Sequence, residues 1–446
     1  MRTEKDNIGE MQLGDEVPYG LQTARAVDNF ALGYKKTSLR LVYAIVTVKK
    51  AAALTYRKLG IGREGVYDAI TGACDEILSG KADEAFVTDA LQGGAGTSTN
   101  MNVNEVIANL ALRKLGHGCG SYEGIHPLDD VNRGQSTNDV YPTALRIAAI
   151  LLLRRLSEAC ARLQQALQAK EGEFEGILKL GRTELMDAVP VTLGQEFGSF
   201  AQAIARDRWR LYKAEERLRQ VNLGGTAVGA GTNAERKYRF GVIEELRELT
   251  GIGLAAAEYP MDITQNNDVF AEVTGLLKAL AVNLMKISND LRLMNSGPKG
   301  GLSEIMLAPL QAGSTIMPGK VNPVIPEMVM QVSMKVMAND YAVSMAASRG
   351  EFELNAFLPL IADSLLESLE LLTNAVELFR TKCIELVKPN ADRCRELLTI
   401  SYAYATEYAA SLGYDQVSKI IEESGGNPEK ALELLKKISG PEKREK

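Results

Sequence analysis

The stretch that decides the fold is ALRIAAILLLRRLSEACARLQQALQA, residues 144–169. Its apolar side chains recur at steps of three and four residues, at Leu145, Ala149, Leu152, Leu156, Cys160, Leu163 and Leu167. This period is typical of an α-helix with an apolar face. Similar runs cover Val273 to Leu291 and Ile361 to Val387. Because alternating β-α-β patterns are absent, the sequence predicts an all-α fold.

The same runs predict a domain organisation. Helices of about 25 residues or more reach roughly 35–40 Å, which exceeds a compact four-helix domain and favours an elongated bundle. Their apolar positions extend around more than one face, so we expect burial against partner subunits. We expect three domains: a mixed, mainly helical domain over 1–136, a central long-helix bundle over 137–390, and a small helical domain over 391–446, whose charged tail from Gly440 frays.

Composition excludes several classes of function. The chain has 446 residues, a formal net charge of −6 and a pI near 5.4, which argues against nucleic-acid and anionic-membrane surfaces. Its start lacks the apolar core of a secretory signal, and it contains no long uninterrupted apolar run, so we expect a cytoplasmic protein. Five scattered cysteines and two histidines indicate reduced thiols and no metal site.

Four polar segments carry the candidate chemistry. The loop Gly313–Pro323 combines glycines, prolines, a hydroxyl pair, a lysine and an amide. These groups suit the binding of small anions, but an ordinary polar connection between helices has a similar composition. The segments 96–105, 134–139 and 181–196 gather hydroxyl, amide and acidic side chains just before helical stretches. Such residues cap helices, and helix N-termini also bind carboxylates and phosphates. Phosphate-loop and serine-hydrolase motifs are absent, so neither of those chemistries is indicated.

Together these segments resemble a known family. AGTSTNMN (95–102), QSTND (135–139), GRT (181–183), DAVP (187–190), TLGQE (192–196) and GSTIMPGKVNP (313–323) are similar to signature regions of the aspartase/fumarase superfamily. The likeness continues to about residue 395, in the family's order and spacing. It implies a homotetramer with a multi-helix core, active sites built from three subunits, and addition or removal of an amine or water across the double bond of fumarate or a fumaroyl group.

The resemblance also implies residue roles. Ser314 matches the catalytic base, on a loop that Gly313 and Gly319 would allow to close. Lys320 and Asn322 match residues that hold the carboxylate next to the leaving group. The matches around the other carboxylate are Thr97, Ser136, Thr137 and Thr315. Asn138 and Thr183 match residues near the amine, and Glu327 matches a supporting glutamate that pairs with histidine in fumarases.

Details within the resemblance favour the aspartase branch, and thus reversible deamination of L-aspartate to fumarate through an enediolate. Glu184 stands where fumarases have histidine, which counts against hydration and favours an ammonium group by direct attraction. Leu128 replaces a usual asparagine, which weakens any secondary dicarboxylate site there. The segment before Gly413 lacks a usual Asn-Pro, which leaves the exact amine open. The alternatives are a fumarate hydratase, an ammonia-lyase acting on an aspartate analogue, and a non-catalytic scaffold. No motif implies a cofactor.

Overall fold

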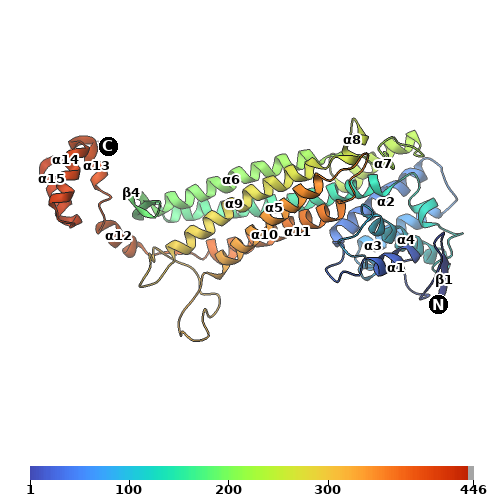
Figure 1. Ribbon diagram of the computed structural model, residues 1–446, viewed down its shortest axis with the longest axis horizontal. Coiled ribbons are helices and arrows are strands. Elements are labelled where there is room, and N and C mark those ends of the chain that lie inside the picture. Colours follow the sequence, from blue (N-terminus) through green and yellow to red (C-terminus); the bar gives the residue numbers. More distant parts are fainter. Residues whose placement is uncertain (440–446) are drawn as a thin grey trace. The chain divides into compact units, whose positions relative to one another are not determined.

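The computed structural model describes residues 1–439; the tail expected to fray, 440–446, lies outside the described residues. Helices dominate, and the strands are short and paired two by two, so the predicted all-α class is confirmed (Figure 1). The described chain contains no helix with the length and apolarity needed to cross a membrane. It forms two compact units, the first being 1–157, 210–279 and 335–372 and the second 158–209, 280–334 and 373 onward. The domains over 1–136, 137–390 and 391–446 remain a prediction.

Long helices contribute residues to both units. They are α5 (Thr137–Glu173), α6 (Leu193–Leu218), α9 (Asp268–Met294), α10 (Val324–Ala347) and α11 (Leu358–Phe379). The apolar positions that predict α5 are buried along its whole length, from Leu145 to Leu167, and those of α9 are buried except for the half-buried Leu276. The helical pattern over 361–387 ends in a π-helical turn, η3 (Arg380–Ile384).

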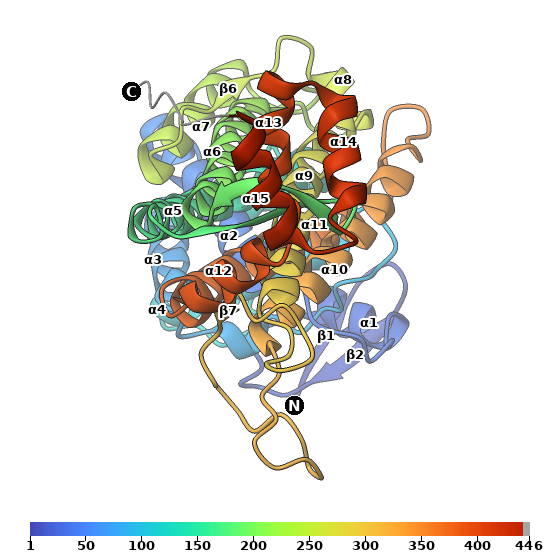
Figure 2. The ribbon, with the colours of Figure 1, turned by 90° about the vertical axis from the view of Figure 1, so that its left-hand side faces the viewer.

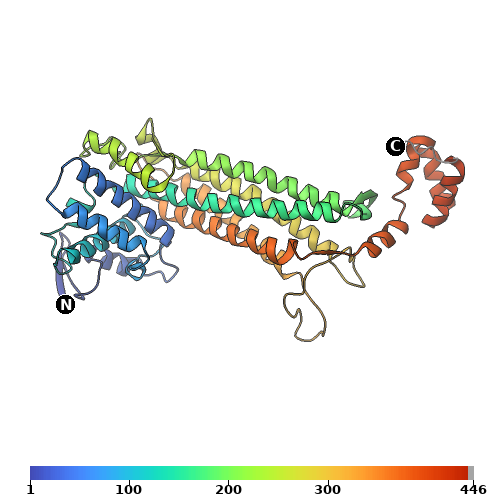
Figure 3. The same ribbon diagram turned by 180° about the vertical axis from the view of Figure 1, so that it is seen from behind.

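Unit 1 also contains shorter elements. They are β1 (Arg2–Lys5), β2 (Glu10–Leu13), α1 (Leu21–Asn29), α2 (Leu39–Lys58), α3 (Val66–Leu78), η1 (Asp83–Ala85), α4 (Thr97–Lys114), η2 (Pro127–Val131), β5 (Gln220–Val221), α7 (Arg236–Thr250), β6 (Ala255–Ala256) and α8 (Pro260–Gln265). β1 pairs antiparallel with β2, and β5 pairs parallel with β6. α2 packs against α3 and α7, and α3 packs against α4. In the ribbon α2, α3 and α4 are blue and α7 is yellow-green (Figure 3).

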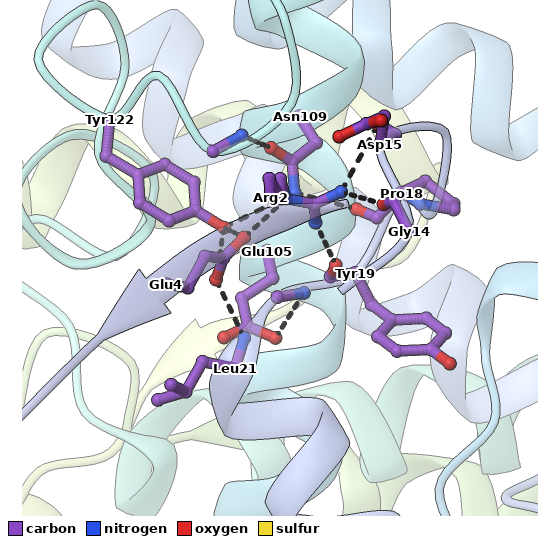
Figure 4. A network of polar contacts seen from close by, with 12 residues as sticks. Arg2, Glu4, Gly14, Asp15, Pro18, Tyr19, Leu21, Glu105, Asn109 and Tyr122 are labelled. Atoms are coloured by element: carbon purple, nitrogen blue, oxygen red, sulfur yellow. Dashed lines mark hydrogen bonds and ion pairs between the residues drawn. The ribbon is translucent and has the colours of Figure 1, made fainter. Parts of the chain in front are cut away.

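The N-terminus of α1 is capped by carboxylates from other elements. Its N-cap residue, Gly20, has no side chain to accept a bond, and a Cβ there would lie 2.9 Å or less from Tyr122, Glu4 and Glu105. Glu105 of α4 instead accepts bonds from the backbone N–H groups of residues 20, 22 and 23, and Glu4 accepts one from Leu21 (Figure 4). Burial raises the pKa of the Glu105 carboxyl. Free N–H groups at a helix start stabilise such anions, so this network ties β1 and α4 to α1.

Unit 2 contains the remaining elements. They are β3 (Leu178–Thr183), β4 (Met186–Thr192), β7 (Ile305–Met306), β8 (Lys388–Pro389), α12 (Ala391–Thr399), α13 (Ala405–Leu412), α14 (Tyr414–Glu423) and α15 (Pro428–Ser439). α12 packs against β3, and the hairpin β3–β4 precedes α6. The helices α13, α14 and α15 lie side by side (Figure 2) around buried Val417, Ile420 and Leu435. Between Ala391 and Ser439 the chain is therefore mainly helical, as its pattern predicts.

Candidate active site

The starts of α4 and α5 meet in unit 1. Thr97 is the first residue of α4, and Thr137 is the first residue of α5. The side-chain amide of Asn100, one turn into α4, donates to Thr137 Oγ1 at 3.1 Å. Gly96, at φ +93°, lies so close to the Tyr141 ring of α5 that a Cβ would be 2.4 Å from it. Two helix N-termini with hydroxyl side chains therefore converge, which suits an anion.

Substituting Gly96 tests this close approach. We expect Gly96→Ala to destabilise the fold by about 1–3 kcal/mol more than Gly94→Ala, because the added methyl group must displace Tyr141. Gly94 is the matched control, since it has a similar φ of +82° but only ordinary contacts around its Cβ position. Denaturant unfolding of both variants gives the difference. Equal losses would mean that the left-handed backbone, and not the contact with α5, requires glycine.

The segment before α5 is held in a defined conformation. Ser136 Oγ accepts a bond from Asn138 N at 3.2 Å, and Asp139 Oδ1 accepts one from Ser136 N at 2.9 Å, which resembles a capping box. The Asn138 side chain donates to Ala227 O at 2.8 Å. Thr137 is buried, whereas Ser136 and Asn138 are half-buried. The structure thus brings Thr97, Ser136, Thr137 and Asn138 into one unit. The hydrogen bonds above fix the backbone of residues 136–139.

Two buried residues, Asp139 and Asn222, anchor this segment, and neither has a role assigned to it from the sequence. Asp139 Oδ2 accepts bonds from Gly224 N and Thr226 N at 3.0 and 2.9 Å, which ties the start of α5 to the glycine-rich turn there. Pro142 lies inside α5 and has no N–H to donate to Asn138 O four residues earlier. The Asn222 side chain donates to that carbonyl at 3.0 Å instead. Pro142, two residues before the helical stretch 144–169, is the sequence signal for such a compensating partner.

Thr183 and Glu184 lie at the end of a hairpin in unit 2. No strand is predicted over 181–190, yet residues 181–183 belong to β3 and residues 186–190 to β4, and the helix begins only at Leu193. Thr192 and Gln195 exchange side-chain to backbone bonds of 3.0 and 2.9 Å, a capping box that opens α6. Glu184 and Leu185 turn the hairpin at φ +53° and +65°, which is uncommon without glycine or asparagine. Outliers of this kind cluster at functional sites.

A buried charge cluster supports this hairpin. Lys179 Nζ contacts Glu196 at 2.7 Å and Glu304 at 3.0 Å, and Arg182 contacts Glu304 at 2.8 Å. Lys179 and Glu304 are almost fully buried, and burial raises the pKa of the Glu196 carboxyl. A cavity of about 390 Å³ lies beside the cluster and is also lined by Glu184. The cluster holds β3 against the start of α6 and the segment that contains Glu304.

The loop Gly313–Pro323 is closed by its own hydrogen bonds and extends away from the flanking parts of α9 and α10 in unit 2 (Figures 1 and 2). Gly313 N donates to Lys320 O at 2.9 Å, and the Asn322 side chain donates to Gly313 O at 2.7 Å. A Cβ at Gly313 would lie 2.5 Å from Lys320 O, so only glycine fits. Gly319 provides the second turn at φ +80°.

Ser314 is the second residue of this loop. Its Oγ accepts bonds from the backbone N–H groups of Ile316 at 3.2 Å and Met317 at 2.9 Å. Two donors aimed at one hydroxyl oxygen favour its ionised form, because hydrogen bonds to a charged state stabilise that state. Thr315 and Lys320 are exposed. The structure therefore places two backbone donors at Ser314 Oγ, six residues before the Lys320 cation.

Glu327, the predicted supporting residue, lies in the first turn of α10. Its carboxylate is 3.7 Å from Arg292 of α9. The resemblance implies that the matching glutamate of fumarases pairs with a histidine instead. Unit 2 thus contains Thr183, Glu184, Gly313, Ser314, Thr315, Gly319, Lys320, Asn322 and Glu327. Among residues 1–439, no group of three or more His, Cys, Asp or Glu side chains is arranged to hold a metal ion.

Comparison with known proteins gives the class. A family profile described as Lyase matches residues 9–338. An aspartate ammonia-lyase of Pseudomonas aeruginosa is 46% identical over 438 residues, 98% of this chain and 92% of that protein. One of Helicobacter pylori is 45% identical over 426 residues, 95% and 91% of the two chains. The crystal structure of a fumarate lyase:delta crystallin from Brucella melitensis superposes with a TM-score of 0.92 at 43% identity. The match covers 99% of this chain and 100% of that chain.

The chain therefore belongs to this lyase family, the aspartase/fumarase superfamily. Within it, the chain is a carbon–nitrogen lyase.

Proposed function

We propose that the chain catalyses the reversible deamination of L-aspartate to fumarate and ammonia, with Ser314 as the base. One observation carries the proposal: near-complete alignment, at 45–46% identity, with relatives that bear the name aspartate ammonia-lyase. The Ser314 geometry supports the mechanism. In the ionised form, Ser314 Oγ removes a proton from Cβ, and the electron pair of that C–H bond moves into the neighbouring carboxylate to form an enediolate. The electrons then return to form the double bond, and the C–N bond breaks to release ammonia.

Stabilisation of the enediolate is assigned to the converging helix starts. The reaction places two negative charges on one carboxyl group, so donors must already point at the oxygens where charge develops. Thr97, Ser136, Thr137 and Thr315 would supply hydroxyl groups, and the N-termini of α4 and α5 would supply the dipole field. Lys320 and Asn322 would hold the other carboxylate. Preorganised donors of this kind typically contribute about 3–4 kcal/mol each when deleted singly.

Glu184, with Thr183 and Asn138 nearby in the proposed site, is assigned to the substrate ammonium group. The Glu184 side chain is exposed at the hairpin end, and no hydrogen bond or ion pair engages it within residues 1–439. We expect Glu184→Gln to raise KM for L-aspartate about fivefold, the factor that corresponds to about 1 kcal/mol of attraction across water. Asp187→Asn is the control, because Asp187 is an exposed acid on the opposite strand. An equal effect of both substitutions on steady-state KM would remove the specific role of Glu184.

We also propose a homotetramer whose active sites combine residues of three subunits. Met334, Tyr341 and Met345 recur at helical spacing on one side of α10, and 48–67% of each side chain is exposed. An apolar helix stripe of this kind fits burial against another copy of the chain. Light scattering should give a mass of about four chains. If sites are shared, mixing and refolding Ser314→Ala chains with Thr97→Val chains should restore activity, because some hybrid sites receive both native residues. No restoration would contradict shared sites.

A direct assay tests the reaction. Purified protein is mixed with L-aspartate or with L-malate, and fumarate absorbance is followed. The proposal requires fumarate from aspartate and little from malate. Fumarate from malate alone would identify a hydratase instead. Inactivity with both substrates would contradict the proposal and favour an aspartate analogue or a scaffold role.

A further inference from the structure

A fully buried lysine bonds to the segment that precedes Ser136 and Thr137. Lys49 is 0% exposed, and it shares the buried face of α2 with Ile45 and Ala52, four residues before and three after it. Its Nζ donates to Asn132 Oδ1 at 2.7 Å and to Gln135 Oε1 at 3.0 Å. In the described chain no carboxylate lies within ion-pair distance of this ammonium group. Burying a cation this way is costly, so the position requires an explanation.

A continuous set of hydrogen bonds leads from Lys49 to the substrate segment. Asn132 Oδ1 also accepts bonds from the side-chain amides of Asn100 and Asn104 at 3.3 and 3.2 Å. Asn100 donates in turn to Thr137 Oγ1 at 3.1 Å, and Asn132 donates to the Gln135 carbonyl at 3.2 Å. Asn100, which bonds Thr137, therefore shares the acceptor Asn132 Oδ1 with Lys49. Gln135, the residue before Ser136, accepts bonds from both Lys49 and Asn132.

We propose that Lys49 is a positioning residue for the substrate dicarboxylate, acting through Asn132 and Gln135 on Ser136 and Thr137. The inference rests on the proposed function and deepens it. The amide contacts hold the hydroxyl-bearing segment in place before substrate arrives, which lowers the ordering cost of binding. The charge of Lys49 adds a positive potential behind the two helix N-termini, where an anion gains from it.

The charge state of Lys49 provides a distinctive signature. The ionisable groups that face it are Asp139 of α5 and Cys74 of α3. Burial lowers the pKa of Lys49 to about 7, against the opposing influence of Asp139, and burial raises the pKa of Cys74 to about 12, so that thiol stays neutral. Lys49 is therefore charged below about pH 7 and loses its proton above it. A bound dianion favours the charged form, so binding is strongest at low pH and weakens as pH rises through about 7.

The test compares Lys49→Met with Lys50→Met. Lys50→Met is the matched control, because this substitution removes the same charge from the next residue. Unlike Lys49, Lys50 forms an ion pair with a carboxylate, Asp75, at 2.5 Å. Calorimetry measures the binding of succinate, whose carboxyl groups do not titrate between pH 7 and 9. We expect Lys49→Met to weaken succinate binding about tenfold and to raise KM for L-aspartate similarly, with kcat changed less than about threefold. The pH dependence of succinate binding seen in the wild type should disappear in Lys49→Met and persist in Lys50→Met.

The outcomes separate this inference from the proposed function. Wild-type affinity and pH dependence in Lys49→Met would overturn it, as would a loss confined to kcat. If Lys49→Met fails to fold, the wild type and Lys50→Met still decide, because pH-independent succinate binding between about pH 7 and 9 would overturn the role of the charge. Succinate binding with the expected Lys49 dependence, but without aspartate turnover, would support the inference while contradicting the deamination.

Discussion

Replacing Ser314 with alanine is expected to lower kcat for L-aspartate deamination about 10³-fold, within the range typical for removal of a general base. Serine is a weak base when neutral, so its oxygen must be activated by its surroundings. The bonds from Ile316 N and Met317 N to Ser314 Oγ supply two such contacts. Alanine keeps the backbone donors but removes the oxygen that they stabilise. The measurement is the rate of fumarate formation at saturating L-aspartate.

Two controls separate loss of the base from damage to the loop. Ile316→Ala changes a side chain of the same loop that is 83% exposed, and it leaves the backbone donor to Ser314 intact, so its kcat should remain near normal. Succinate affinity of Ser314→Ala should also stay close to that of the wild type, because the residues assigned to the carboxylates are unchanged. Near-normal turnover by Ser314→Ala would show that another group removes the proton.

Replacing Lys179 with methionine is expected to reduce the free energy of unfolding by about 3–5 kcal/mol, the range found when one partner of a buried ion pair is removed. Lys179 is 2% exposed and contacts two carboxylates, Glu196 and Glu304. Without it, Glu196 loses its cation, and Glu304, which is 0% exposed, keeps only Arg182. Denaturant unfolding at a fixed protein concentration measures the loss, since association also affects apparent stability.

Lys286→Met is the matched control. Lys286 lines the same cavity and forms an ion pair with Asp290, but its side chain is 63% exposed. Exposed pairs contribute little, so the expected loss is about 1 kcal/mol or less. Similar losses in both variants would mean that burial does not distinguish Lys179. A stable Lys179→Met protein would show that the neighbouring carboxylates take up protons or rearrange at low cost.

The helices could be predicted because their signal is local. The spacing of Leu145, Leu156 and Leu163 predicts a buried helix face, and these side chains are fully buried in α5. The hairpin β3–β4 was not predicted, since its strands are short and lie next to a helix whose pattern dominates the segment. Its turn residues, Glu184 and Leu185, also lack the glycine or asparagine that usually identifies such a turn.

The candidate site shows the same division. Side-chain chemistry and order along the chain point to Ser314, Lys320 and the hydroxyl clusters. The role of Lys49 could not be predicted from a motif, although a lysine on the apolar face of a helix was a signal in the sequence. Its partners, Asn132 and Gln135, are more than 80 residues away in the chain, and only folding brings them within hydrogen-bond distance.

The amino-acid sequence by itself determined the helical class, the family and the chemical types available to the site, because these depend on local periodicity and on which side chains occur in which order. Tertiary structure decided where those side chains lie. It placed the start of α4 against α5, directed two backbone N–H groups at Ser314, and buried Lys49 against Asn132 and Gln135. The physical reason is that each of these features depends on close packing between segments, and the energy of such contacts is set by distances that no single segment contains.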